Sequence, residues 1–289
     1  MKYTVRNLRE DFPDEDACLL WLVEYLFPDG ITCKICQKIT KHYKVTGRKA
    51  YACSRCGHHV HPTAGTIFHK SRTPLSLWYH AFYLMSTNKA GTSAAQLQRE
   101  IGVTYKCAWR MMHQIRTLMN TDRQLSGEVE VDETYVHANV YKRSTAQKRY
   151  GRTGQRAGQV LFGAVERGGR VRIWHVKSAG ARVLQPLIRK NVKEGTLIHT
   201  DGYRAYRRLP QMGFGHRWTD HGRGEYYTED SYTQNIENVW SHFKRGIKGV
   251  YRHVDNKYLQ AYANEYAWRY SNRKKPSMFW SLMCQISIS

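Results

Sequence analysis

The sequence predicts a mixed α/β protein with three successive parts: a metal-binding segment, a helical region and a domain built around a sheet. Three observations lead to this prediction. Two CxxC pairs lie near the N-terminus, and apolar residues recur at helical spacing between 73 and 120. From 126 onward the pattern changes to alternation of apolar and polar residues, which is typical of strands with one buried face.

The chain is strongly basic, and its charge indicates what it binds. Its 289 residues include 46 Lys and Arg but only 23 Asp and Glu, which leaves a net charge of +23. The basic residues recur along the chain rather than in one tail. Such an excess favours a polyanionic partner, because neutralising phosphates releases counterions and supplies most non-specific affinity. We therefore expect a protein that binds nucleic acid.

Neither export nor membrane insertion is expected. The hydrophobic fraction of 41% is that of a globular protein. No apolar stretch approaches the roughly 18–20 residues that a membrane-spanning helix requires. The N-terminal residues contain acids where a signal peptide would be apolar. The expected location is the cytoplasm, in association with the nucleoid.

Four of the seven cysteines form a pattern that is typical of a structural zinc site. They are arranged as two CxxC steps with 16 residues between them: Cys33, Cys36, Cys53 and Cys56. Each step is a tight turn that presents two thiolates, and two such turns complete a tetrahedral Zn²⁺ site. The residues between the pairs alternate like a hairpin around a Gly turn. We predict a zinc ribbon at 31–66, preceded by a short helical segment at 1–30.

The region 67–122 is expected to be helical and contains a candidate DNA-binding motif. A helix, a Gly-centred turn and a second helix follow one another in "AAQLQREIGVTYKCAWRMMHQIRTLM". The spacing matches a helix-turn-helix, whose second helix enters the major groove of DNA. Three basic residues are candidate DNA contacts: Lys106, Arg110 and Arg116. An ordinary helical hairpin is the alternative that the sequence leaves open.

The order of elements from 126 to 250 predicts an RNase H-like fold of the DDE integrase type. Three strands, a helix, a strand, a helix, a strand and a final helix follow one another, and a Gly-Gly hairpin joins the second and third strands. In this architecture the first and fourth strands are neighbours in the central sheet. A basic, Gly-rich loop at 142–158 follows the first strand, and the final helix is expected to start near Ser231. A helical extension occupies 251–289.

Three carboxylates fall at positions that this fold would bring together. Asp132 stands at the end of the first strand, Asp201 at the end of the fourth, and Glu237 on the final helix. Clustered carboxylates suit Mg²⁺ or Mn²⁺, which prefer hard oxygen ligands. A two-metal site can activate one oxygen and stabilise another in phosphodiester transfer. Lys244 lies seven positions after Glu237, hence on the same helix face, from which it can reach phosphates.

Several segments occur together in the order of a known family: "CKIC…CSRC", "HPTAGTIF", "PLSLWYHAFYLM", "QLQREIGVTYKCAWRMMHQIR", "EVDETYV", "HTDGYRAY" and "NIENVWSHFKRGIKGVYRHV". With them, nearly the whole chain resembles the DDE-type insertion-sequence transposases that carry an N-terminal zinc ribbon, bacterial and archaeal relatives of the eukaryotic Merlin elements. The resemblance implies an RNase H-like catalytic domain in which Asp132, Asp201 and Glu237 are the metal-binding acids. It also implies that Lys244 is the basic residue that follows them.

The resemblance implies a transposase that binds the terminal inverted repeats of its own element. The zinc ribbon and the helix-turn-helix would recognise DNA, and the sheet domain would perform Mg²⁺- or Mn²⁺-dependent phosphodiester cleavage and strand transfer into target DNA. Phosphates would be held by Lys244, Arg245 and Lys248. Pairing two DNA ends implies a homo-oligomer, a dimer or larger. A DNA-binding regulator without catalysis and a metal-dependent nuclease are the alternative functions.

For two of the three proposed metal-binding acids, the sequence offers alternative residues. Glu130 and Glu133 are alternatives to the acid of the first strand, because both lie close to it in the sequence. The third position varies within the family and is Asn in some members, so Asn235 and Asn238 are rivals of Glu237. A carboxylate binds Mg²⁺ better than an amide does, which favours Glu237.

Overall fold

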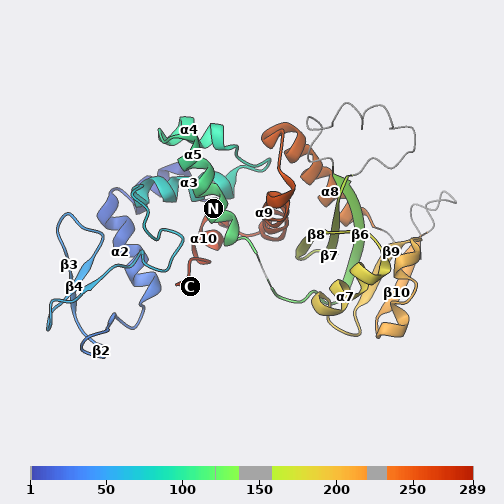
Figure 1. Cartoon of the computed structure of the whole chain (residues 1–289), viewed down its shortest axis with the longest axis horizontal. Helices are drawn as coiled ribbons and strands as arrows, with labels where there is room; N and C mark the ends of the chain where they lie inside the picture. Colours follow the sequence, from blue (N-terminus) through green and yellow to red (C-terminus); the bar gives the residue numbers. More distant parts are fainter. Residues whose placement is uncertain (1, 121, 137–157, 220–232, 289) are drawn as a thin grey trace. The chain divides into compact units, whose positions relative to one another are not determined.

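The computed structural model describes residues 2–120, 122–136, 158–219 and 233–288, which fold into two compact units (Figure 1). The first, here called the N-terminal unit, comprises 1–88, 94–118 and 275–289. The second, the sheet unit, comprises 89–93 and 119–274. The segment 251–289, which the sequence suggests as one extension, is therefore divided between the two units.

Helices and short strands make up the N-terminal unit. Its helices are α1 (Val5–Asp11), α2 (Glu15–Leu26), α3 (Leu75–Thr87), α4 (Ala94–Ile101), α5 (Tyr105–Thr117) and α10 (Met278–Met283). Its strands are β1 (Thr32–Cys33), β2 (Lys38–Ile39), β3 (His42–Lys44), β4 (Tyr51–Cys53) and β5 (His59–Val60). β1 pairs with β2, while β4 lies between β3 and β5 in a second antiparallel sheet. The expected hairpin is thus confirmed, with Gly47 at φ 71° in its turn.

Local sequence signals explain where the helices of the candidate DNA-binding motif begin and end. Thr104 is the N-cap of α5, since its hydroxyl accepts a hydrogen bond from the backbone N–H of Cys107 at 3.3 Å. Gly102, at φ 69°, allows the turn between α4 and α5. Leu97 and Ile101 of α4 are buried, as are Ala108, Met111, Met112 and Ile115 of α5. The two helices expected in this region are therefore confirmed.

The described residues of the sheet unit form five strands and the helices that cover them. Its strands are β6 (Glu128–Val136), β7 (Gln159–Glu166), β8 (Val171–Val176), β9 (Leu197–Asp201) and β10 (Gly215–Thr219). Its α-helices are α7 (Ala181–Asn191), α8 (Gln234–Gly246) and α9 (Leu259–Asn272). Shorter segments are the 3₁₀ turns η1 (Arg204–Tyr206), η2 (Pro210–Met212) and η5 (Asn256–Tyr258), and the π-helical turn η4 (Ile247–Tyr251).

The five strands form one mixed sheet in the order β10-β9-β6-β7-β8. β6 runs parallel to β9 and antiparallel to β7, so the first and fourth strands of this unit are neighbours, as predicted. One face of the sheet packs on α7, and its core includes Val129, Phe162 and Leu184. The other face packs on α8 and α9, and its core includes Leu161 and Trp240. Both faces of the sheet are therefore covered by helices.

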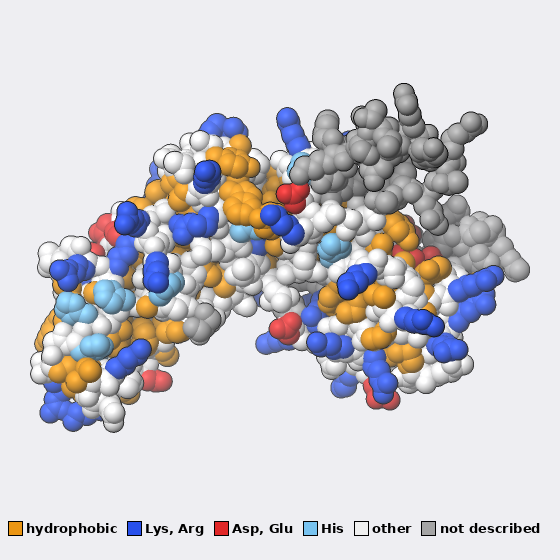
Figure 2. Space-filling view, in the orientation of Figure 1, with side chains coloured by type: hydrophobic (Ala, Val, Ile, Leu, Met, Phe, Trp, Pro, Cys, Tyr) orange, Lys and Arg blue, Asp and Glu red, His pale blue; other side chains and the backbone are white. Residues whose placement is uncertain are grey.

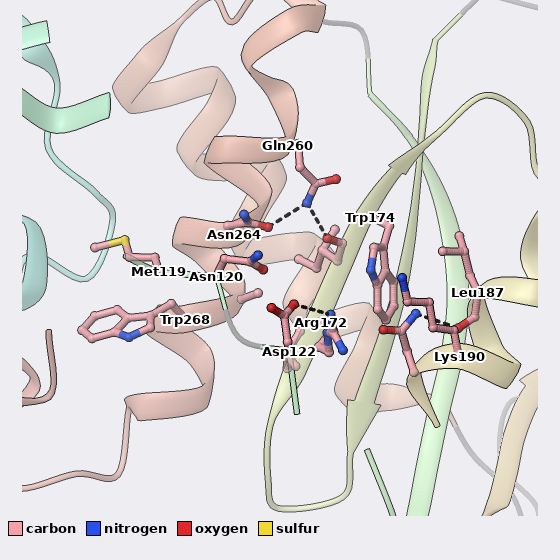
Figure 3. A pocket seen from close by; sticks show the side chains of 14 residues that line it. Met119, Asn120, Asp122, Arg172, Trp174, Leu187, Lys190, Gln260, Asn264 and Trp268 are labelled. Atoms are coloured by element: carbon pink, nitrogen blue, oxygen red, sulfur yellow. Dashed lines mark hydrogen bonds and ion pairs between the residues drawn. The ribbon is translucent and has the colours of Figure 1, made fainter. Parts of the chain in front are cut away.

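Helix α9 also covers the open edge of the sheet at β8 (Figure 3). Gln260 of α9 accepts a hydrogen bond from the backbone N–H of His175 at 2.7 Å and donates to the carbonyl of Ile173 at 2.8 Å. Ser271, near the other end of α9, accepts from the N–H of Val171 at 2.9 Å. Backbone groups of an edge strand would otherwise be available for pairing with another chain. Side chains of α9 thus satisfy part of that edge.

Some elements differ from their sequence predictions. β6 continues to Val136, so Asp132 lies inside the strand rather than at its end. The helix expected after β9 is replaced by η1 and η2, because Pro210 and the left-handed Gly213 (φ 86°) interrupt a longer helix. α8 begins at Gln234, and its expected start near Ser231 lies outside the described residues.

Almost all of the basic loop expected at 142–158 lies outside the described residues. Among the helices that are described, none is both long enough and apolar enough to cross a bilayer.

Candidate functional site

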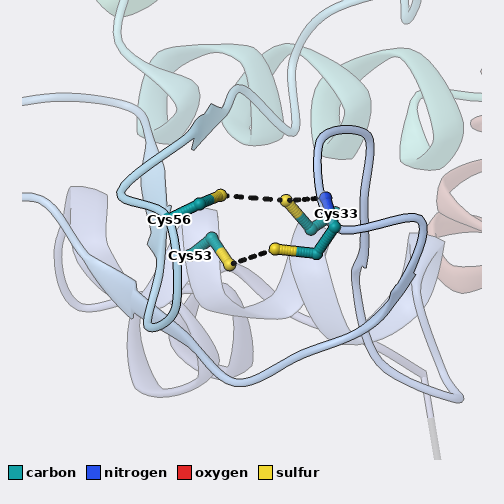
Figure 4. A group of neighbouring side chains, drawn as sticks. Cys33, Cys53 and Cys56 are labelled. Carbon is teal, nitrogen blue, oxygen red and sulfur yellow. Dashed lines mark hydrogen bonds between the residues drawn. The ribbon is translucent and has the colours of Figure 1, made fainter.

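The four cysteines of the predicted zinc ribbon lie together in the N-terminal unit (Figure 4). Their sulfur atoms are all within 4.8 Å of one another. The Sγ atoms of Cys33 and Cys56 are 3.5 Å apart, and those of Cys36 and Cys53 are 3.9 Å apart. Zn–S bonds of about 2.3 Å directed to the corners of a tetrahedron separate the sulfur atoms by roughly 3.8 Å. The four thiols therefore have the arrangement that one Zn²⁺ requires.

A hydrogen bond at the cysteine cluster favours the thiolate form of Cys53, which is the form that binds metal, whereas the contact with Cys56 is the largest influence that raises the pKa of Cys36. The Thr40 hydroxyl lies 3.2 Å from the Sγ of Cys53. This hydrogen bond is the largest influence that lowers the pKa of Cys53, to about 5. The backbone N–H of Cys36 donates to the Sγ of Cys33 at 3.5 Å. Thr40 is a neighbour of the site that the cysteine spacing alone does not reveal.

Strand register brings the first two predicted acids to the same place in the sheet unit. β6 and β9 are paired in parallel, with Val129 opposite Ile198 and Glu130 opposite His199. The observed pairs end at Glu130 and His199; continued for two residues at the same offset of 69, the register would set Asp132 opposite Asp201, where β9 ends. Paired residues on neighbouring strands point to the same face of a sheet. Asp132 and Asp201 therefore both face the side that α8 covers.

The third predicted acid comes from the helix on that side. Glu237 is exposed in the first turn of α8, and the Thr233 hydroxyl donates to its Oε1 at 3.2 Å. α8 packs across β6 and β7. Among the described residues, the cysteines are the one set of three or more possible ligands within 4.8 Å of one another. The three acids thus share one face of the sheet at a wider spacing than the thiols.

A buried carboxylate fixes the start of α8. Glu130 is fully buried, and its oxygens accept hydrogen bonds from the backbone N–H groups of Asn235 and Ile236 at 2.9 and 3.1 Å. It also accepts from the Asn235 side-chain amide at 2.7 Å and from Arg167 at 3.2 Å. The residue before α8, Thr233, makes no side-chain cap. A strand residue therefore caps this helix, and Glu130 and Asn235 are both engaged in holding α8 on β6.

Trp240 of α8 orients the first acid. Its indole N–H donates to Oδ2 of Asp132 at 2.9 Å. The ring can lie there because the residue paired with Asp132 on β7 is Gly163. A Cβ at Gly163 would lie 2.6 Å from Cζ2 of Trp240 and 2.8 Å from Cδ1 of Ile236. Gly163 therefore provides the space in which Trp240 reaches the carboxylate.

Replacing Gly163 by Ala is expected to displace α8, because the added methyl group would overlap Trp240 and Ile236. Overpacking of this kind lowers the free energy of unfolding by about 1–3 kcal/mol. Urea unfolding of the purified variant measures this loss. Gly249→Ala is the matched control, since nothing lies within 4 Å of a Cβ at that position. A Gly163→Ala protein as stable as the control would contradict the packing described.

The electrostatics of the site reflect its concentrated negative charge. Burial is the main cause that raises the pKa of Asp132, to about 6, and the charges of Asp201 and Glu237 raise it further. The hydrogen bond from Trp240 acts in the opposite direction. Asp201 and Glu237 are therefore both close enough to Asp132 for their charges to act on its carboxylate.

The raised pKa of Asp132 predicts how stability depends on pH in Mg²⁺-free buffer. The ordinary pKa of Asp132 is 3.8, and its folded value is about 6. Between these values the unfolded chain holds fewer protons than the folded one, so the contribution of Asp132 to stability falls as pH rises. Asp132→Asn removes this titration while keeping an oxygen for Trp240. The difference in Tm between variant and wild type is therefore expected to grow from about pH 4 to 7, and a constant difference would exclude the effect.

Glu133 occupies the opposite face of β6. It accepts a hydrogen bond from the hydroxyl of Tyr206, which belongs to η1. Burial raises the pKa of Glu133 to about 7, and the charges of Asp132 and Asp201 raise it further. Burial also raises the pKa of Tyr203, with smaller contributions from Glu133 and from Tyr135. Glu133 thus lies at the same end of the sheet as the three acids but faces away from Glu237.

Most of the predicted DNA-contacting residues are exposed, with one exception. The exposed ones are Lys106, Arg110, Lys244, Arg245 and Lys248. Arg116 differs from its prediction: only 1% of its surface is exposed, so its guanidinium is buried and cannot meet a phosphate. Figure 2 shows many Lys and Arg side chains on this face of the chain and few acidic ones.

Comparison with known families identifies two segments of the chain. Residues 124–271 match the ISXO2-like transposase domain, and residues 13–59 match the transposase zinc-ribbon domain. The first match begins just before β6 and ends within α9. It therefore includes all three predicted acids and the residues that position them.

Individual relatives agree with this result. A protein of Halobacterium salinarum described as an uncharacterized protein in transposable element ISH50 is 27% identical over 267 residues, which is 87% of this chain and 90% of that protein. An uncharacterized transposase-like protein of Haemophilus influenzae is 28% identical over 97 residues, covering 34% of this chain and 77% of that protein.

Among solved structures, a chain of the Mos1 strand transfer complex aligns with a TM-score of 0.24 and 10% identity, over 66% of this chain and 75% of that chain. A score this low carries no argument about the present fold. The match to the ISXO2-like transposase domain, by contrast, spans just over half of the residues. The chain therefore belongs to the family of ISXO2-like transposases.

Proposed function

We propose that this chain is an active transposase that binds the terminal inverted repeats of its element, cleaves the DNA at each end and joins the freed 3′-hydroxyl to target DNA. The observation that supports the proposal is the parallel pairing of β6 with β9, which, continued at the same offset, would set Asp132 beside Asp201 on the face that α8 covers. The strand order β10-β9-β6-β7-β8 with helices on both faces supports an RNase H-like fold for the sheet unit.

The three acids fit a site for Mg²⁺ or Mn²⁺. Their oxygens are the ligands that these cations prefer, and a bound cation would offset the unfavourable action of the Asp201 and Glu237 charges on Asp132. Asp132, Asp201 and Glu237 would hold the metal. When bound, Mg²⁺ or Mn²⁺ supplies Lewis-acid polarisation of the phosphate and lowers the pKa of the attacking oxygen.

The surrounding residues have supporting roles in this proposal. Trp240 holds the carboxylate of Asp132 in one orientation, and Glu130 holds the helix that carries Glu237. Lys244 lies on the exposed side of α8, two helical turns beyond Glu237, where it neutralises a DNA phosphate. No side chain needs to form a covalent bond to DNA, because the attacking groups are water and then the freed 3′-hydroxyl.

DNA recognition is assigned to the N-terminal unit. α5 follows α4 in the manner of a helix-turn-helix and exposes Lys106 and Arg110. One structural Zn²⁺, held by the four clustered cysteines, keeps the ribbon folded. The net charge of +23 supports extensive phosphate contact. Pairing two DNA ends requires a dimer or larger assembly.

A donor plasmid that carries the element between its own ends tests the proposal. With Mg²⁺ or Mn²⁺ the purified protein should cut at those ends and join them to a target plasmid. Cleavage without joining would instead indicate a metal-dependent nuclease. Binding without any cleavage, and without dependence on the divalent cation, would indicate a DNA-binding regulator.

A further inference from the structure

Three exposed aromatic side chains line the end of the sheet next to the predicted acids. Trp218 is 57% exposed, Tyr135 is 53% exposed and Tyr203 is 39% exposed. Large aromatic side chains are usually buried, because burying 150–250 Å² of such a surface is favourable. Three of them exposed at one end of a sheet therefore point to a binding surface. We call this set the aromatic rim.

Sheet topology places the members of the rim on adjacent strands. Tyr135 lies on β6, Tyr203 follows the end of β9, and Trp218 lies on β10. These strands are neighbours in the order β10-β9-β6. Neighbouring strands are about 4.8 Å apart and each strand residue rises about 3.3 Å, so Trp218 and Tyr135, two strands and four residues apart, are separated by roughly 16 Å. That length suits a few successive bases but not the side of a duplex.

The side chains also share one face. Tyr135 is paired with Val160 of β7, and Val160 belongs to the core on the α7 side. Trp218 is paired with Thr200, the neighbour of Asp201 in β9, and so points away from the face of Asp201. The Trp218 ring lies over Gly202, where a Cβ would be 3.6 Å from it. The rim thus borders the three acids on the face opposite α8.

One contact joins the rim directly to the candidate active site. The backbone N–H of Tyr203 donates to Oδ1 of Asp201 at 3.1 Å. The Tyr203 ring is held edge-on against the Tyr206 ring, with centroids 5.9 Å apart and an interplanar angle of 77°. Tyr203 is two positions after Asp201 in the sequence. A nucleotide stacked on the Tyr203 ring would therefore lie next to a proposed metal ligand.

The charges around the rim suit a polyanion. Exposed arginines follow Tyr203 in the sequence: Arg204, Arg207 and Arg208. Aromatic side chains combined with basic ones are the usual means of holding single-stranded nucleic acid, because every base has a face that can stack and every phosphate carries a charge. A protein partner would not require this alternation of rings and guanidinium groups.

We propose that the aromatic rim binds unpaired bases at the end of the DNA substrate. The proposal rests on the function proposed above, since it assigns the rim to the DNA end that enters the same site. Unstacking the terminal bases costs a few kcal/mol in a duplex, and stacking on Tyr203 and Trp218 offsets that cost. The rim then guides the DNA end toward Asp132 and Asp201.

Fluorescence anisotropy in Ca²⁺ tests the proposal with labelled oligonucleotides. One probe is a 20-base-pair blunt duplex, the second carries an added three-thymidine 3′ overhang, and the third has abasic sites in place of the three thymines. The wild type is expected to bind the overhang about tenfold more tightly than the blunt duplex and to lose that preference with the abasic probe. No preference in the wild type would overturn the proposal.

Variants separate stacking from general DNA affinity. Trp218→Ala and Tyr203→Ala are expected to reduce the overhang preference to about one, whereas Trp218→Phe restores most of it. Tyr43→Ala is the matched control, since Tyr43 is similarly exposed (55%) but belongs to the zinc ribbon. Equal weakening of blunt and overhang binding in the rim variants would overturn the proposal.

The same set of probes distinguishes this proposal from the proposed function. Asp201→Asn is expected to abolish cleavage of the donor plasmid while leaving the overhang preference unchanged. Absence of cleavage in the wild type with an intact, rim-dependent preference would reject the transposase activity and keep the rim. Normal cleavage by a wild type whose overhang preference does not depend on the rim would keep the transposase activity and reject the rim proposal.

Discussion

Asp201→Asn is expected to reduce cleavage of the donor plasmid by about 10³-fold, since a metal ligand that stabilises phosphoryl transfer contributes several kcal/mol. The substitution keeps the shape of the side chain, and its oxygen can still accept the hydrogen bond from the Tyr203 N–H. What it removes is the negative charge that attracts the cation. Cleavage rates at saturating DNA, measured over a range of Mg²⁺ and Mn²⁺ concentrations, report the loss.

The control for this experiment is an acid of the sheet unit that lies outside the proposed site. Asp255→Asn changes an exposed acid of the sheet unit that pairs with His253, so it should leave cleavage unchanged. DNA binding by Asp201→Asn should match the wild type, which shows that the variant is folded. Full cleavage by Asp201→Asn would show that Asp201 is not an active-site residue. It would thereby contradict the proposed grouping of Asp132, Asp201 and Glu237.

Loss of the zinc ligands is expected to unfold the ribbon of the N-terminal unit. Its strands are only two or three residues long, and a unit with so small a core depends on the metal for its fold. Binding of structural Zn²⁺ contributes about 10–16 kcal/mol in isolated zinc fingers at neutral pH. Cys53→Ser should therefore abolish zinc content and remove hydrogen-exchange protection from 31–66.

Protection in the sheet unit provides the internal reference for that measurement. The sheet unit has its own cores on both faces of β6, so its exchange protection should persist in Cys53→Ser. Cys284→Ser replaces an exposed thiol outside the cluster and should retain one zinc per chain. Retention of ribbon protection without zinc would contradict a structural role for the metal.

Patterns that depend on spacing could be predicted from the sequence. The two CxxC steps specify four converging thiols whatever the rest of the fold. The alternation in 128–131 and the turn after Asp201 give two strand positions, and neighbouring parallel strands follow from the order of elements. The face that each acid occupies then follows from its parity in the strand. For this reason the neighbouring positions of β6 and β9 could be predicted.

Contacts between distant elements could not be predicted in the same way. Nothing in the local sequence distinguishes Glu130, which caps α8, from its exposed neighbour Glu128. Position 163 requires glycine because the Trp240 ring of α8 packs directly against it, and this contact exists only in the folded protein. Arg116 is a basic residue in a basic helix, yet the helix turns it into the core. Each of these depends on which face a helix presents to another element, and sequence periodicity fixes this only for strongly apolar residues.

The cap that β6 supplies to α8 has a consequence for how the chain can vary. Because Glu130 holds the backbone of Asn235 and Ile236, the start of α8 is set by a neighbouring strand and not by the length of the connection from β10. Lengthening a connection carries only a slow, logarithmic entropic penalty. Evolution or a protein engineer can therefore insert residues between 220 and 232 without moving the third acid out of register with the first two.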